Sequence, residues 1–285
     1  MYATIEVLTK GVRMVQKTLY VSDLDGTLLQ RDQTLSAFTV ETINALLERG
    51  MLFSYATARS EHSAGPITAP LAKKFPVIVY NGTFILENGT KKRLLSNAFS
   101  AEEAHGILHT LMAGGVYPFV YAFIDGAERF SYSEPHASDD MFEFLETRKG
   151  DERKRPTTPE RMFDGEIFHF TCMDTAERLF PLYEKLKDTF GCHYGNDLYS
   201  GKPWLEIHPR AATKANAILE LKRMLGCDKV VCFGDGKNDL SMFEIADECY
   251  AVANAEDELK RTATAVIGSN ADDGVAKWLL ENVSL

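Results

Sequence analysis

The chain has 285 residues, of which 45% are hydrophobic and 25% are charged, as in a typical folded globular protein. Its 31 Lys and Arg residues are outnumbered by 41 Asp and Glu residues, which gives a formal net charge of −10. This acidity excludes bulk attraction to nucleic acid or to an anionic membrane, so we predict neither as a partner. With no apolar run of membrane-spanning length and no secretory signal, we expect a cytoplasmic protein.

The first part of the chain alternates short apolar runs with amphipathic stretches, the pattern of βαβ units in a parallel sheet. Ser36 and Gly50 are expected to begin and end a helix. The turn signal Asn88-Gly89 predicts a hairpin between residues 83–86 and 94–95. The predicted strands of this part are residues 19–21, 52–55 and 77–80.

The same pattern returns near the C-terminus, but the middle of the chain differs. It combines aromatic strands, helices and a charged loop, which we interpret as a second α/β module inserted into the first. Its expected elements are strands at 117–124 and 167–172, helices at 101–112 and 175–190, and a loop at 150–160. The returning elements are helices at 214–225 and 239–246 and strands at 204–207, 229–233, 250–252 and 265–267. The predicted domains are residues 1–84 with 203–285, and residues 85–202.

Two carboxylates follow the first predicted strand. Asp23 and Asp25 lie two residues apart in the segment that leaves this strand, so both side chains can point to one side. Ligands of open α/β sheets bind beyond the carboxyl ends of the strands. Carboxylates this close repel each other, so either one pKa rises or a cation lies between them. A solvated Asp-Gly turn is the alternative interpretation.

A second acidic cluster follows another predicted strand. Residues 229–233 lead into Gly234-Asp235-Gly236-Lys237-Asn238-Asp239. If both strands belong to one parallel sheet, Asp235 and Asp239 converge on the first carboxylate pair. Oxygen ligands in this number suit Mg²⁺, which takes a few carboxylates, water and a phosphate oxygen. A helix-capping Asp in a Gly-rich turn explains one of these acids but not both clusters.

Two further residues fit a phosphate site. Thr57 follows the strand at 52–55, where a hydroxyl and free backbone N–H groups can meet an anion. Lys214 lies at a predicted helix start, and its ammonium would offset the carboxylates and neutralise phosphoryl charge. Alone, each has an ordinary explanation, as a helix cap and a surface lysine. Beside the acids, both favour a phosphate site.

These motifs, in their order along the chain, resemble those of the haloacid dehalogenase superfamily. More narrowly, they resemble its Cof-type (subfamily IIB), sugar-phosphatase-like branch. Residues 23–27 match the first motif, Thr57 the second, Lys214 the third and residues 234–239 the fourth. The resemblance implies a three-layer, Rossmann-like parallel-sheet core with an inserted α/β cap domain. It also implies an Mg²⁺-dependent phosphatase of small phosphorylated metabolites, either sugar phosphates or phosphorylated cofactors.

The resemblance assigns roles to single residues. Asp23 would be the nucleophile that forms an aspartyl-phosphate, and Asp25 the general acid and then the base. Thr57, Ala58 and Lys214 would bind the phosphoryl group, although the family usually has glycine where Ala58 stands. Metal ligands and their supporting residues would be Asp23, Asp25 (through its backbone carbonyl), Asp235, Asn238 and Asp239.

Two other functions would use the same motifs. A phosphomutase would employ the same acids and return the phosphoryl group to a reoriented sugar. A sensor would bind a phosphorylated metabolite without turnover. An acid at Asp25 favours a phosphate ester with an alcohol leaving group, because that group needs a proton as it departs. The oligomeric state is left open.

Some features lie outside these motifs. His105 and His109 have the spacing of a metal pair but lack a third ligand, which favours an ordinary helix face. Residues 148–155 carry mixed charge and are expected to form a solvated loop, while the aromatic stretch 117–123 is expected to be cap core. Candidate substrate contacts above the acids are Arg59, Asn81, Arg129 and His136.

Overall fold

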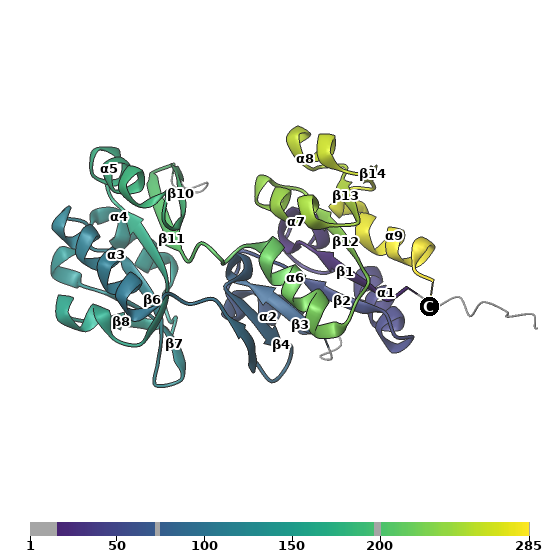
Figure 1. The fold of residues 1–285 in the computed structure, drawn as a ribbon, viewed down its shortest axis with the longest axis horizontal. Coiled ribbons are helices and arrows are strands. Elements are labelled where there is room, and N and C mark those ends of the chain that lie inside the picture. The colour runs from purple at the N-terminus through teal and green to yellow at the C-terminus, as the bar shows by residue number, and fades with distance from the viewer. Residues whose placement is uncertain (1–15, 72–74, 197–200, 285) are drawn as a thin grey trace, which may run out of the picture.

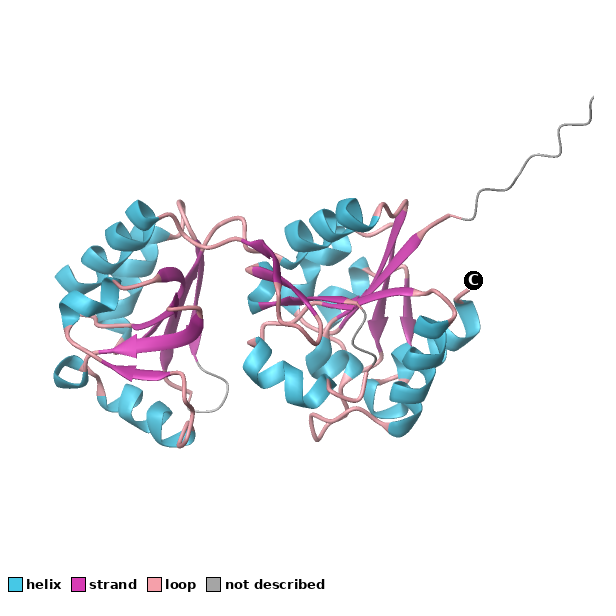
Figure 2. Cartoon of the chain, turned by 90° about the horizontal axis from the view of Figure 1, so that it is seen from below, coloured by secondary structure: helices cyan, strands magenta, loops and turns pink. Residues whose placement is uncertain are grey.

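The computed structural model describes residues 16–71, 75–196 and 201–284, which form two lobes joined by two chain segments (Figure 1). One lobe contains both ends of the described chain, and the other contains its middle. Each lobe combines sheet with helices, as Figure 2 shows, so the expected α/β class is confirmed.

The lobe built from both ends, called the core domain below, has a parallel sheet of five described strands in the order β14-β13-β12-β1-β2. These strands are β1 (Thr18–Ser22), β2 (Leu52–Tyr55), β12 (Lys229–Gly234), β13 (Glu248–Val252) and β14 (Ala265–Ile267). The helices are α1 (Ala37–Glu48), α2 (Glu61–Thr68), α6 (Lys214–Leu225), α7 (Leu240–Ile245), α8 (Asp257–Thr262) and α9 (Gly274–Asn282).

Helices cover both faces of this parallel sheet. The chain leaves β1 in one direction through α1 and leaves β12 in the other through α7, so right-handed crossovers place these two helices on opposite faces. Helix α9 packs beside α1, and α6 packs beside α7. The result is the three-layer arrangement that the sequence predicts.

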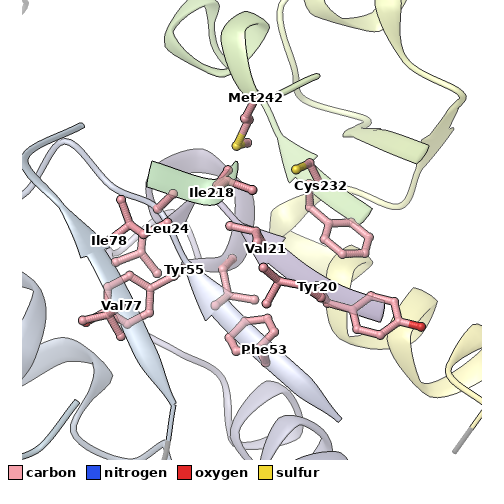
Figure 3. Close-up of a cluster of buried hydrophobic side chains, with 14 of the residues drawn as sticks. Tyr20, Val21, Leu24, Phe53, Tyr55, Val77, Ile78, Ile218, Cys232 and Met242 are labelled. Atoms are coloured by element: carbon pink, nitrogen blue, oxygen red, sulfur yellow. The ribbon is translucent and has the colours of Figure 1, made fainter. Parts of the chain in front are cut away.

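The interior of the core domain lies around β1. Figure 3 shows Val21 and Leu24 in a cluster with Tyr55, Ile78 and Ile218, and each of these side chains is at most 1% exposed. Because helices cover both faces, the central strands are apolar on both sides and do not alternate in polarity. This is why the short apolar runs predicted the strands.

The middle lobe, called the cap, has a sheet of six described strands in the order β10-β11-β9-β6-β7-β8, antiparallel except for the β7–β8 pair. Its strands are β6 (Phe119–Ile124), β7 (Ala127–Tyr132), β8 (Lys154–Pro156), β9 (Glu166–Met173), β10 (Gly191–Asn196) and β11 (Pro203–His208). Helices α3 (Ala101–Ala113) and α5 (Ala176–Leu186) cover one face, and α4 (Asp139–Thr147) packs on part of the other.

A small sheet lies between the lobes. It contains β3 (Pro76–Val79), β4 (Phe84–Glu87) and β5 (Arg93–Ser96), and a bridge between Ala56 and Ile78 joins it to the end of β2. The predicted hairpin is confirmed. Residues 84–86 are buried with the core domain, whereas the cluster inside the cap begins at Phe99. We therefore propose that the cap runs from near Phe99 to the end of β11, since a boundary after residue 84 runs through this sheet and a boundary after residue 202 would assign β11 of the cap sheet to the core domain.

The charged segment 148–155 is only partly the solvated loop that the sequence predicts: residues 148–150 are exposed, but the end of the segment is not. Arg153 is only 8% exposed, and residues 154–156 form β8. The Arg153 guanidinium donates to Asp151 and to Glu128 of β7. Mixed charge predicts solvation, but at Arg153 opposite charges neutralise one another in the interior.

The aromatic stretch 117–123 is only partly cap core. Phe119 and Val120 are fully buried, as expected. Tyr121 instead points away from α3 and α5 and lines a cleft between the lobes. Alternation along β6 sends neighbouring side chains to opposite faces of the sheet, so one run of residues serves two surfaces.

Candidate active site

Asp23 and Asp25 follow β1 at the carboxyl edge of the parallel sheet. The Asp23 N–H donates to the Phe233 carbonyl (2.9 Å), which ties the end of β1 to the end of β12. The chain then turns at Gly26, whose φ is +73°. A side chain at Gly26 would overlap the Asp235 carboxylate, so glycine permits both the turn and the approach of the second acidic cluster.

Lys214 lies between the two acidic clusters and is 1% exposed. Its Nζ lies 2.6 Å from Asp23 Oδ1 and 2.7 Å from Asp239 Oδ1. Thr213 caps the helix that begins at Lys214, accepting an N–H bond from the first turn. A side chain at Gly82 would overlap the Thr213 carbonyl, so this glycine lets the helix start approach the sheet. Lys214 is therefore a buried charge and not a surface lysine.

Asp239 organises the loop after β12. Its Oδ2 accepts the N–H groups of Asp235 (2.9 Å) and Gly236 (3.1 Å), while its Oδ1 accepts from Lys214. Both oxygens of this fully buried side chain are thus engaged by the protein. Asn238 is exposed, and its Oδ1 lies close to Gly236. The arrangement makes Asp239 a positioning residue for Lys214 and for the Asp235 backbone.

The buried acids carry more negative charge than one ammonium balances. Burial raises the pKa of Asp23 to about 8, with Lys214 lowering it and Asp239 raising it further. Burial also raises the pKa of Asp235 to about 6, assisted by the Asp239 charge and opposed by a hydrogen bond from Thr27. The pKa of Lys214 lies above its usual range, because Asp23 and Asp239 outweigh the effect of burial.

A divalent cation fits this excess of carboxylate. One oxygen from each of Asp23, Asp235 and Asp239 lies within 4.8 Å of the other two. Since Asp239 already uses both of its oxygens within the protein, Asp23 and Asp235 are the carboxylates placed to bind a metal. Carboxylate oxygens are the ligands of Mg²⁺, and the raised pKa values show that bare carboxylates are disfavoured here. The residues present therefore fit Mg²⁺.

Thr57, Ala58 and Asn81 lie together beyond β2 and β3. Thr57 Oγ1 accepts the Arg59 N–H (3.1 Å), which leaves its own hydroxyl proton for another acceptor. The Asn81 N–H donates to the Thr57 carbonyl (2.9 Å), so the two loops hold each other. Within the described residues, Asn81 Oδ1 is buried without a hydrogen-bond partner. Ala58 is not in the left-handed region, so its methyl group adds no backbone strain where the family usually has glycine.

Arg59 holds the Asp25 carboxylate. Its Nε and Nη2 lie 2.7 and 2.5 Å from the two oxygens of Asp25, and Nη2 also donates to Gln33 (2.8 Å). Both oxygens of Asp25 accept hydrogen bonds from this guanidinium, so neither is placed to donate a proton. Asp25 must therefore separate from Arg59 before it can act as an acid. Sequence reasoning placed both residues near the site but did not foresee that they pair.

A cleft of about 1090 Å³ lies between the core domain and the cap. Its core side contains Asp25, Ala58, Arg59 and Asn81. Its cap side contains residues that sequence reasoning did not single out as a binding surface, namely Tyr121, His169, Thr171, Trp204 and Glu206. The alternation of side chains along β6, β9 and β11 indicates from sequence which residues share a face of the sheet, but it does not indicate which face meets the cleft.

Two candidate substrate contacts lie elsewhere in the described structure. Arg129 donates to the carbonyls of Glu128 and Glu152, and His136 stacks on Tyr117 with a centroid distance of 4.1 Å. Neither is among the described residues that line the cleft.

The histidine pair on α3 packs as an ordinary helix face. His105 and His109 lie against the Phe163 ring at centroid distances of 5.0 and 4.9 Å. No metal-binding group of the described residues includes either histidine.

Known proteins resemble this chain over almost its whole length. A family model described as haloacid dehalogenase-like hydrolase matches residues 20–279. The 5-amino-6-(5-phospho-D-ribitylamino)uracil phosphatase YwtE of Bacillus subtilis is 30% identical, covering 90% of this chain and 95% of that one. Pyridoxal phosphate phosphatase YbhA of Escherichia coli is 25% identical, with 92% and 98% covered. A crystal structure of a Thermotoga maritima protein has a TM-score of 0.78 at 27% identity, with 95% and 98% covered.

A parallel sheet with a lysine among carboxylates at its edge, beneath an inserted cap, defines a class of hydrolases with an α/β fold. The chain belongs to the haloacid dehalogenase-like hydrolase family, in its Cof-type branch. It is a phosphatase, as the sequence predicts. Within the described residues, no helix has the length and apolar character needed to cross a bilayer.

Proposed function

We propose that this enzyme is an Mg²⁺-dependent phosphatase of sugar phosphates or phosphorylated cofactors, and that it works through an aspartyl-phosphate on Asp23. The observation that carries the proposal is the buried contact of Asp23 with Lys214, beside Asp235 and Asp239. An anionic nucleophile reaches an anionic phosphate only where preorganised positive charge offsets both. The names of the two relatives, both phosphatases of phosphorylated small molecules, support the substrate class.

In the first half-reaction, an Asp23 oxygen forms a bond to phosphorus while the bond from phosphorus to the alcohol oxygen breaks. Lys214 holds Asp23 Oδ1 at 2.6 Å, which orients the carboxylate and leaves its second oxygen to attack. The Thr57 hydroxyl and the Ala58 backbone N–H bind phosphoryl oxygens. Asp25, once separated from Arg59, protonates the departing alcohol.

In the second half-reaction, Asp25 acts as a base. Its carboxylate takes a proton from water while the water oxygen forms a bond to phosphorus. The bond between phosphorus and Asp23 breaks, which regenerates the carboxylate and releases inorganic phosphate.

Asp23, Asp235 and the Asp25 backbone carbonyl would hold the Mg²⁺. When bound, the ion neutralises phosphoryl charge that these carboxylates would otherwise repel. Asp239 and Asn238 would support the metal site, and Asp239 also holds Lys214.

Phosphate release from a panel of sugar phosphates, phosphorylated cofactors and p-nitrophenyl phosphate tests this proposal. Turnover should require Mg²⁺, stop with EDTA, and fall to background in Asp23→Asn. The matched control is Glu102→Gln, on the exposed face of α3, which should retain activity. Turnover that is insensitive to EDTA, or that survives Asp23→Asn, would contradict the proposed chemistry.

The same panel separates the alternatives. A phosphomutase would need a bisphosphate activator and give an isomerised product, and a sensor would bind esters without releasing phosphate.

We also place the enzyme in the cytoplasm, which is supported by its five cysteines, all present as free thiols.

A further inference from the structure

The cap sheet has two chemically different faces. Val120, Phe170 and Leu205 are buried against the cap helices. Their neighbours along the same strands point the other way, since successive strand residues alternate between faces. These neighbours line the cleft and are called the cap wall below: Tyr121, His169, Thr171, Trp204 and Glu206.

Strand pairing brings the cap wall together. Tyr121 lies opposite His169 in the β6–β9 pair, and Glu206 lies opposite Thr171 in the β11–β9 pair. His169 Nε2 is 3.8 Å from Glu206 Oε1, and the rings of His169 and Tyr121 meet edge to face at 5.4 Å. The wall therefore presents a carboxylate among aromatic rings and a hydroxyl.

Glu206 is ionised within this wall. Burial by itself raises the pKa of Glu206, but the neighbouring His169 imidazole, 3.8 Å away, and the Trp204 side chain lower it to about 2. The side chain keeps 31% exposure and lines the cleft. A carboxylate in this position is best satisfied by a ligand that donates hydrogen bonds or carries positive charge.

Most of the positive charge that lines the cleft is already engaged by the protein. Three of the four described Arg and Lys residues in its lining lie against protein carboxylates, in the pairs Arg59–Asp25 (2.5 Å), Arg153–Glu128 (2.6 Å) and Lys202–Asp140 (2.5 Å). The Arg148 guanidinium lies over the Phe144 ring at 4.8 Å. A second phosphate or carboxylate at any of the three ion pairs would have to displace a protein carboxylate, and one at the cap wall would meet the charge of Glu206.

We propose that the cap wall binds the alcohol part of the substrate and that Glu206 makes it selective for one class. That class is a ring-bearing phosphate monoester whose ring carries N–H or O–H donors and no second anion. The rings of Tyr121 and Trp204 pack on the substrate ring, and Glu206 accepts its donors. The inference rests on the proposed phosphatase function. Nitrogen heterocycles and sugars both offer this chemistry, so the experiment includes both.

Two series of esters vary the charge of one substituent on the ring. The first is pyridoxamine, pyridoxine and 4-pyridoxic acid 5′-phosphate; the second is glucosamine 6-phosphate, glucose 6-phosphate and glucose 1,6-bisphosphate. In the preferred series, kcat/KM should be at least about tenfold higher for the amine than for the anionic member. Glu206→Gln should reduce that ratio to within about threefold, because it removes the charge and keeps the shape. The series with the higher kcat/KM identifies the ring.

Binding provides a readout that does not need turnover. Isothermal titration calorimetry measures the affinity of the same esters for Asp23→Asn. This variant should show the same order of affinities, and the double variant Asp23→Asn with Glu206→Gln should show the same loss of selectivity. Glu102→Gln should leave the ratio unchanged. The inference is overturned if the amine and anionic esters of a series have equal kcat/KM and equal affinity. It is also overturned if Glu206→Gln leaves the ratio of kcat/KM between these two esters unchanged. Failure to hydrolyse any ester contradicts the proposed function, while binding still decides the role of Glu206.

Discussion

At the scale of single residues, Lys214 shows how surroundings change what a side chain does. Taking an ammonium out of water costs several kcal/mol, and this cost is offset only by close opposite charges. Asp23 and Asp239 supply these charges at 2.6 and 2.7 Å. The same contacts hold the proposed nucleophile, so stability and chemistry depend on one ion-pair cluster.

Lys214→Met should strongly destabilise the protein without metal. It leaves two buried carboxylates without their cation, and we expect the free energy of unfolding to fall by about 3–5 kcal/mol at neutral pH. Urea denaturation with EDTA measures the loss, and Mg²⁺ should restore part of it. Lys149→Met, at a 76% exposed side chain, should change stability by less than about 0.5 kcal/mol. Equal effects of the two substitutions would contradict the structural role of Lys214.

Asp25→Asn should slow release of an alkyl alcohol by about 10²–10⁴-fold, since the acid that protonates it is gone. Release of p-nitrophenolate should slow much less, because this leaving group departs without a proton. Single-turnover measurements isolate this step from hydrolysis of the intermediate. If both leaving groups slow equally, Asp25 does not act as the proposed acid.

At the scale of elements, a hydrogen-bond network joins the cap to the core domain. The Tyr80 hydroxyl donates to Glu128 on β7 (2.6 Å), and Arg153 donates to Glu128 (2.6 Å) and to Ser60 (3.1 Å). Tyr80 precedes Asn81, and both have a φ of +51°, a conformation held only by surrounding contacts. The network thus connects the cap to the loop that contacts Thr57.

Tyr80→Phe should weaken substrate binding more than catalysis. It removes one buried hydrogen bond while Arg153 still satisfies Glu128, so stability should fall by only about 1 kcal/mol. We expect KM to rise severalfold with a smaller change in kcat, because the cap loses one tie to the core domain. Tyr20→Phe, in the core-domain interior, is the matched control. An unchanged KM would show that this contact does not position the cap.

Asp151 should make the cap's stability sensitive to acid. Burial alone would raise the pKa of Asp151, but hydrogen bonds from Arg153 lower it to about 2. Because an unfolded Asp titrates near 3.9, this group stabilises the fold above about pH 4 and stops doing so as the pH falls toward 2. Asp151→Asn should lower the free energy of unfolding by about 2 kcal/mol at pH 7. Denaturation curves at several pH values measure the difference in the free energy of unfolding between Asp151→Asn and the unmodified protein. This difference should narrow below about pH 4, and a difference that stays constant with pH would contradict the role of Asp151.

At the scale of the whole molecule, metal binding should couple to stability. A ligand present at a hundred times its Kd stabilises the folded state by about 2.7 kcal/mol. Thermal unfolding should therefore shift upward with Mg²⁺ and return with EDTA. Asp235→Asn should remain folded but lose most of this shift, whereas Glu134→Gln, at an exposed cap position, should keep it. A full shift in Asp235→Asn would place the metal elsewhere.

The sequence by itself determined the strands of the core domain and their order along the chain, because these depend on neighbouring residues, whereas β7, β8, β10 and α4 of the cap were not predicted. Ser36 caps α1 by accepting the Thr39 N–H (3.0 Å), as its position before the helix predicts. The motifs containing Asp23 and Asp235 each follow an apolar run, and parallel strands bring such positions to one edge. The α/β core and the composition of the acidic cluster could therefore be predicted without coordinates.

Only the tertiary structure decided which distant side chains meet. Strand alternation shows that the cap sheet has two faces, but the packing of α3 and α5 decides that the face with Glu206 meets the cleft. The pairing of Arg59 with Asp25 and the burial of Arg153 against Glu128 also join residues far apart in the chain. Charge pairing and desolvation depend on distances in space, which local sequence patterns do not contain.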